Sequence, residues 1–238
     1  MSLSLWESFT RSAKKMADDA FCEFKNREDW ERARPALRKE FMRALGLDPL
    51  PPKCDPKVKI LGELKGKGFK VKKITYQLLP DCWGAGLFYY PDLDKSEKRP
   101  GVLYVCGHTA TGSCGYQPNA IMWARRGYVC LIVDSIQHND NPGEHRGTDL
   151  GYSKNWLSMG YSAAGGETFN AIRALDVLEI DEHVDKNRLG VTGVSGGGAC
   201  SFHLAVVDER VKAVSTLCGI CSPYDMIANR HIRKHCDC

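Results

Sequence analysis

Apolar residues recur at helical spacing near the start of the chain. They lie three or four positions apart at Leu5, Phe9, Ala13, Met16, Ala20 and Phe24. This spacing predicts an amphipathic helix over residues 5–24, and a similar pattern predicts a second helix from about Trp30 to Leu45. A proline-rich connector follows at 48–57. We therefore expect residues 1–57 to form an N-terminal helical extension and residues 58–238 to form the main domain.

After residue 57 the pattern becomes strand-like. Residues 70–77 alternate between apolar and polar side chains, and residues 84–90 follow across a turn, which predicts an antiparallel pair. Residues 102–106 and 128–133 are nearly continuous apolar runs. Such runs are typical of strands buried on both faces of a parallel sheet.

Helices and strands alternate along the rest of the chain. We expect a helix at about 168–180, a strand at 189–194, a helix at 197–207 and a strand at 211–217. Alternation of this kind predicts an α/β fold, with a mainly parallel sheet flanked by helices.

Composition excludes several classes of protein. The chain has 238 residues, 43% of them hydrophobic and 26% charged, as in ordinary globular domains. Its net charge of +4 comes from scattered lysines and arginines, so we expect no nucleic-acid partner. The apolar runs are too short to cross a membrane, and charges near the N-terminus argue against an export signal.

The cysteines point to a reducing compartment. There are 11 of them, scattered along the chain, and we expect free thiols and a cytoplasmic location. One cluster has the residue types of a zinc site, namely Cys218, Cys221, His235, Cys236 and Cys238. Its first cysteine ends a predicted strand and its last pair lies at the chain terminus, so we expect no metal and no cofactor.

The best candidate for chemistry is Ser195. The stretch Gly193-Val194-Ser195-Gly196-Gly197 has the pattern G-x-S-x-G and lies between a predicted strand and a predicted helix. This is the context of a nucleophile elbow, in which small neighbours let a strained serine stand at the N-terminus of a helix. The helix dipole and free N–H groups there favour developing negative charge.

Two other interpretations of the same turn stay open. It could be a glycine-rich turn without covalent chemistry, or it could bind a nucleotide, because it superficially resembles dinucleotide loops. Against the nucleotide interpretation, Ala199 replaces the usual last glycine and the turn follows a late strand, whereas the fingerprint belongs to the first βα unit.

Acyl transfer also needs donors for an oxyanion. In an elbow one donor is the backbone N–H of the residue after the nucleophile, here Gly196, and the second comes from the loop after an earlier strand. That loop begins Cys106-Gly107-His108-Thr109, so the N–H of His108 or Thr109 is the second candidate. For the His108 side chain we favour a lining or packing role over that of general base.

These segments together resemble the α/β-hydrolase superfamily, and most of all its acetyl xylan esterase and dienelactone hydrolase-like branch. The resemblance covers roughly residues 68–220, with an N-terminal stretch, EFMRALGLDPLPP, that is also similar. It rests on GAGLFYYPD (84–92), RPGVLYVCGH (99–108), GYVCLIVDS (127–135), AIRALDVLE (171–179) and DKNRLGVTGVSGGGA (185–199). It implies a serine-dependent carboxylic ester hydrolase without a cofactor, with a small-molecule or carbohydrate ester as substrate and acetyl xylan deacetylation as one option.

The chain departs from that pattern after the elbow. The expected order is serine, then an acid, then a histidine after the last strand, yet only one strand pattern, 211–217, follows the elbow helix. Asp225 is the candidate acid. His203, His231 and His235 are poorly placed for a base, so we expect the last strands and the catalytic histidine to be missing, beyond Cys238, and the strand at 211–217 to be an exposed edge.

A second hypothesis follows from that expectation. The chain could be a non-catalytic or truncated hydrolase-fold protein, in which the elbow is kept without hydrolysis. A homo-oligomer is compatible with either hypothesis.

Overall fold

The computed structural model describes residues 4–92, 97–136, 138–141 and 159–230. Seven strands form one sheet in the order β1-β2-β3-β5-β4-β6-β7. Their bounds are β1 Lys59–Gly66, β2 Phe69–Leu79, β3 Cys82–Pro91, β4 Arg99–Val105, β5 Val129–Val133, β6 Val184–Val194 and β7 Val211–Leu217. The sheet is mixed, because β5, β4, β6 and β7 are parallel whereas β1, β2 and β3 join by antiparallel pairing.

Helices cover both faces of the sheet. Their bounds are α1 Leu5–Asp19, α2 Arg27–Ala44, α3 Gly112–Arg125, α5 Ala163–Ile180, α6 Gly196–Val207 and α7 Pro223–Ala228. One core cluster joins α5 and α6 to the side chains of Leu103 and Leu131. A second cluster, on the opposite face, joins α3 to Val102 and Ile132. Neighbouring residues of β4 and β5 thus point into different cores, which is why both strands are apolar throughout.

The sequence predictions of the fold class and of the central elements are confirmed. The antiparallel pair is β2 and β3, and the two continuous apolar runs are β4 and β5, both fully buried over 102–105 and 129–133. The sheet has one more strand than predicted, since β1 was missed, and α3 was missed too. The first helix ends at Asp19, short of the predicted Phe24.

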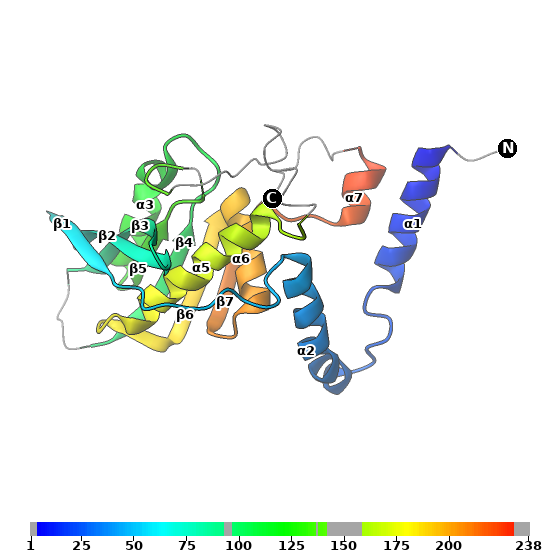
Figure 1. The fold of residues 1–238 in the computed structure, drawn as a ribbon, viewed down its shortest axis with the longest axis horizontal. Helices are drawn as coiled ribbons and strands as arrows, with labels where there is room; N and C mark the ends of the chain where they lie inside the picture. Colours follow the sequence, from blue (N-terminus) through cyan, green and yellow to red (C-terminus); the bar gives the residue numbers. More distant parts are fainter. Residues whose placement is uncertain (1–3, 93–96, 137, 142–158, 231–238) are drawn as a thin grey trace.

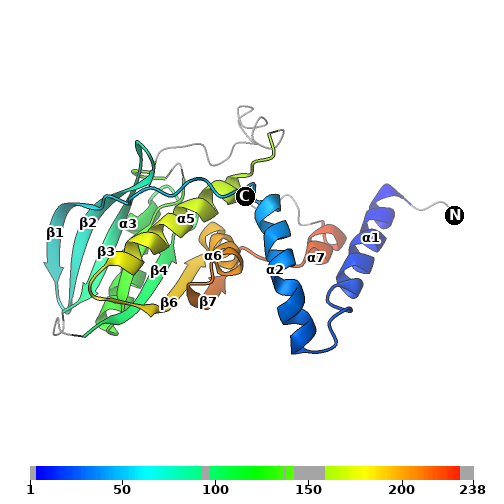
Figure 2. The same cartoon turned by 60° about the horizontal axis from the view of Figure 1, so that its bottom comes forward.

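The N-terminal helices lie at the β7 side of the sheet, and β1 lies at the other end (Figures 1 and 2). Helix α2 packs against α6, where the Phe41 and Phe202 rings meet edge to face and Arg38 donates from Nε to the Val206 carbonyl oxygen over 2.9 Å. Helix α1 packs against α7, with Lys14 Nζ 5.9 Å from the centre of the Tyr224 ring.

Strand β7 ends the strand order in the described part of the chain. Its backbone pairs with β6 on one side only, and the side chains of Val214 and Leu217 are 48% and 50% exposed. No helix in the described ranges is long and apolar enough to cross a bilayer.

Candidate active site

Ser195 stands at the turn between β6 and α6, the place that the sequence predicted for it. Its backbone has φ 58° and ψ −122°, a conformation that side-chain-bearing residues rarely adopt. The residue is exposed, and its side chain makes no capping hydrogen bond to α6. A strained, exposed serine at a strand–helix turn has the geometry of a nucleophile elbow.

Close backbone approach explains the glycines around this serine. A Cβ atom on Gly197 would lie 2.1 Å from the carbonyl oxygen of Val105, at the end of β4. Since that neighbour is backbone, it could not move aside, and only glycine lets α6 begin so near the sheet.

The N-terminus of helix α6 lies directly beside Ser195. The first N–H groups of a helix have no acceptor within the helix, and in α6 they belong to Gly196, Gly197 and Gly198. The bond from the Ala199 N–H to the Ser195 carbonyl oxygen, 3.0 Å long, is the first of the helical ladder. The N–H of Gly196 is therefore placed to donate a hydrogen bond to an oxyanion that forms beside Ser195.

The loop after β4 lies directly against the serine. A Cβ atom on Gly107 would be 3.4 Å from Ser195 Cβ and 2.6 Å from the Val194 carbonyl oxygen. The two candidates for the second oxyanion donor follow in this loop. Thr109 turns toward α3, because its Oγ1 accepts the Gly112 N–H over 3.1 Å, whereas the His108 ring lies over Gly196.

The His108 side chain belongs to a buried polar cluster. Its Nε2 is 2.8 Å from Glu167 Oε1, and the two side chains are 7% and 4% exposed. The imidazole ring stacks on that of His138, with 5.6 Å between centroids and 15° between planes. Sequence reasoning missed Glu167. The available signal was a single acidic residue among small and apolar residues in the first turns of α5.

The other titratable candidates lie elsewhere. Asp225 is an exposed residue of α7, the helix that packs against α1. His203 lies on α6 and clusters with the Phe41 and Phe202 rings, 5.7 and 5.9 Å away. Burial lowers its pKa, although the charge of Glu167 acts in the opposite direction. His231 and His235 lie outside the described residues.

Two members of the predicted cysteine cluster lie in the described part of the chain. Cys218 and Cys221 are exposed, while His235, Cys236 and Cys238 lie outside the described residues. Within the described ranges, no three side chains of histidine, cysteine, aspartate or glutamate come together in a way that could hold a metal ion.

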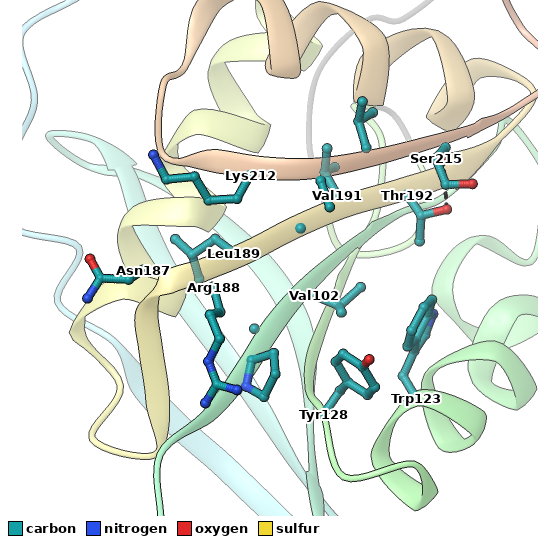
Figure 3. Close-up of a pocket in the computed structure, with 15 residues that line it drawn as sticks. Val102, Trp123, Tyr128, Asn187, Arg188, Leu189, Val191, Thr192, Lys212 and Ser215 are labelled. Atoms are coloured by element: carbon teal, nitrogen blue, oxygen red, sulfur yellow. Dashed lines mark hydrogen bonds between the residues drawn. The ribbon is translucent and has the colours of Figure 1, made fainter.

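A groove of about 400 Å³ lies on the side of the sheet that carries α3, over the strands at the β7 end (Figure 3). Its floor is formed by β4, β6 and β7, and the rings of Trp123 and Tyr128 stand along one side. Arg188 and Lys212 lie toward one end, where the strands begin. Ser195 and His108 are not among its lining residues, so this groove is separate from the elbow.

The profile of the PET hydrolase-like family matches residues 49–229 of this chain. Among curated proteins, dipeptidyl-peptidase 5 of Porphyromonas gingivalis is 28% identical over 135 residues, which are 55% of this chain and 18% of that protein. A provisionally assigned hydrolase of Bacillus subtilis, YtaP, is 26% identical over 109 residues, 46% of this chain and 36% of the relative. The chain thus matches little more than a third of these relatives' length at most.

Solved structures agree in fold. A provisionally assigned acetyl xylan esterase from Bacteroides fragilis superposes with a TM-score of 0.77 at 17% identity, over 95% of this chain and 63% of that one. An acetyl xylan esterase from Paenibacillus sp. R4 gives a TM-score of 0.62 at 19% identity, over 92% and 73%. At these identities the similarity establishes the α/β-hydrolase fold.

Proposed function

Because the chain belongs to the PET hydrolase-like family, we propose that it hydrolyses carboxylic esters through an acyl-serine intermediate on Ser195. One observation carries this proposal: an exposed serine with φ 58° stands at the N-terminus of α6, with the loop after β4 packed against it. An elbow with donors on two sides is the arrangement that acyl transfer needs.

In the proposed reaction Ser195 Oγ forms a bond to the ester carbonyl carbon while a histidine takes its proton. The oxyanion of the tetrahedral intermediate accepts hydrogen bonds from the N–H of Gly196 and from that of His108 or Thr109. Collapse breaks the bond to the alcohol, which leaves with the proton, and water then hydrolyses the acyl-serine to a carboxylic acid. That the histidine follows Ser195 in the chain, with Asp225 as the acid, stays a prediction.

We propose small acyl esters of carbohydrates, acetyl esters first, as the substrates. The fold relatives named acetyl xylan esterases support this choice by analogy. The assay compares p-nitrophenyl acetate with p-nitrophenyl octanoate, and acetylated xylan with unmodified xylan. A preference for the octanoate, with no acetate released from xylan, would contradict the proposed substrate class.

The nucleophile is tested with a fluorophosphonate probe, which reacts with activated serines. We expect labelling of the wild type and none of Ser195→Ala. The matched control is Ser222→Ala, because Ser222 is also exposed and also precedes a helix, and this variant should label like the wild type. A well-folded wild-type chain that is not labelled would contradict the esterase proposal for these 238 residues, and would favour the hypothesis of a non-catalytic or truncated hydrolase-fold protein. A rise in Tm with adenine nucleotides would instead support the nucleotide-binding alternative.

A further inference from the structure

We propose that Glu167 is a positioning residue of this site, because its carboxylate holds the His108 imidazole, and with it the loop after β4, against Gly196. The inference rests on the proposed function, since it concerns the oxyanion donors of the same serine. It assigns a role to a residue 28 positions before the nucleophile, on a helix that the elbow motif does not include.

Removing the Glu167 carboxylate and the His108 imidazole from water costs free energy, and this cost needs an explanation. Both side chains are nearly buried, and the distance of 2.8 Å between Nε2 and Oε1 is that of a charge-assisted hydrogen bond. Buried polar pairs seldom stabilise a fold more than well-packed apolar side chains of the same volume. A buried carboxylate–imidazole pair beside a strained serine therefore indicates a role in the site rather than in folding alone.

The imidazole touches the elbow itself. A Cβ atom on Gly196 would lie 2.2 Å from His108 Cε1 and 2.5 Å from each of the two ring nitrogens. The Cε1 edge of the ring therefore faces the α-carbon of Gly196, the residue that carries the first oxyanion donor. Since the backbone of His108 also carries a candidate second donor, the contact between ring and glycine sets the spacing of the two donors.

Glu167 is in turn fixed relative to the elbow helix. Helix α5 is capped by Ser162, whose Oγ accepts the Gly165 N–H over 3.1 Å. On α6, Cys200 donates its thiol to the carbonyl oxygen of Glu167 over 3.6 Å. The backbone of Glu167 thus contacts α6 while its carboxylate holds the loop after β4. Glu167 therefore connects the two segments that carry the proposed oxyanion donors.

The test compares Glu167→Ala and Glu167→Gln with the wild type on p-nitrophenyl acetate. Glu167→Ala removes the carboxylate that holds the ring, and we expect kcat to fall by roughly 30–100-fold with KM changed by less than about 3-fold, as for a misplaced catalytic group. Glu167→Gln keeps a hydrogen-bond acceptor at the same place. We expect this conservative variant to recover at least about a fifth of the wild-type kcat.

The matched control is Asp176→Asn, which alters another buried carboxylate of α5 that lies far along the helix from Glu167. It should lower Tm and leave kcat within about 2-fold, because Asp176 pairs with arginines away from the elbow. Near-UV circular dichroism and Tm establish that each variant is folded. If Glu167→Ala is unfolded, the kcat of Glu167→Gln is compared with that of Asp176→Asn at matched Tm: a lower kcat for Glu167→Gln supports the inference, and an equal kcat contradicts it.

Two results would overturn the inference while leaving the proposed function intact. One is a folded Glu167→Ala that keeps wild-type kcat and wild-type fluorophosphonate labelling of Ser195. The other is a shift of about one unit or more in the acid limb of the kcat/KM profile of Glu167→Gln, which would identify His108 as the general base. If the wild type is neither labelled nor active, the proposed function itself fails.

Discussion

The backbone N–H of Ser195 donates a 2.8 Å hydrogen bond to the carbonyl oxygen of Leu217, the last residue of β7. The bond joins the elbow to the neighbouring strand immediately before that strand turns away. Gly219 follows with φ 82° and passes so near that a Cβ atom on it would lie 2.0 Å from the Ser195 carbonyl oxygen. The strained conformation of Ser195 is therefore supported from β7 as well as from its own glycines.

This support leads to a prediction about Gly219. Gly219→Ala should lower the free energy of unfolding by roughly 3 kcal/mol or more, because it adds a clash with backbone to an unfavourable φ. Gly160→Ala is the control, since Gly160 has the same φ of 82° with nothing within 4 Å of the added methyl. It should cost only about 1 kcal/mol. Urea unfolding measures both, and equal losses would show that the contact with Ser195 is unimportant.

A second prediction concerns Arg173, which is 1% exposed on α5. Its guanidinium pairs with Asp176 and donates over 3.0 Å to the carbonyl oxygen of Gln77 and over 2.5 Å to that of Cys54. Arg173→Met should destabilise the fold by roughly 3–5 kcal/mol, because it leaves buried acceptors without their donor. Thermal and urea unfolding provide the measurement.

The control for Arg173 is an ion pair of similar geometry at the surface. Arg188 Nε is 2.6 Å from Asp185 Oδ2, but the arginine side chain is 55% exposed. Arg188→Met should cost only about 0–1 kcal/mol, since water screens and replaces the pair. A loss in Arg173→Met no larger than that in Arg188→Met would mean that the buried contacts do not matter for stability.

The third prediction is a pH dependence from His203. Burial lowers the pKa of this histidine in the folded chain below its usual value of about 6.5. The unfolded chain then binds the proton more readily, so this histidine's contribution to stability is present above about pH 6.5 and is lost as the pH falls toward the folded-state pKa. The difference in unfolding free energy between wild type and His203→Gln should therefore shrink between about pH 7.5 and pH 5. A difference that stays constant over this range would contradict the prediction.

The fourth prediction separates the cysteines by reactivity. Burial raises the pKa of the Cys106, Cys130 and Cys200 thiols, which keeps them protonated and unreactive. Among the described residues, five cysteines are exposed: Cys22, Cys82, Cys114, Cys218 and Cys221. Iodoacetamide at about pH 8 should alkylate these five in the native protein and the buried three only in urea, as peptide mass spectrometry can measure. Alkylation of Cys130 at the rate of Cys82 would contradict the burial.

The elements that the sequence predicted best are those whose pattern reflects burial. Strands β4 and β5 are apolar because both faces of the sheet are covered, and that requirement is visible in the residues themselves. Strand β1 was missed because it lies at the sheet edge, and five of its eight residues are charged or glycine and most are exposed. Helix α3 was missed because glycines and Pro118 interrupt its apolar pattern.

The site divides in the same way. The sequence by itself determined the strand–Ser195–helix turn and the loop after β4, because the glycines that permit close backbone approach are adjacent to the residues they serve. Only the tertiary structure decided that Glu167 meets His108, 59 positions away, and that Leu217 supports the elbow. Contacts between elements depend on how helices and strands pack around the sheet, and side chains so far apart in the chain carry no local pattern that reveals their meeting.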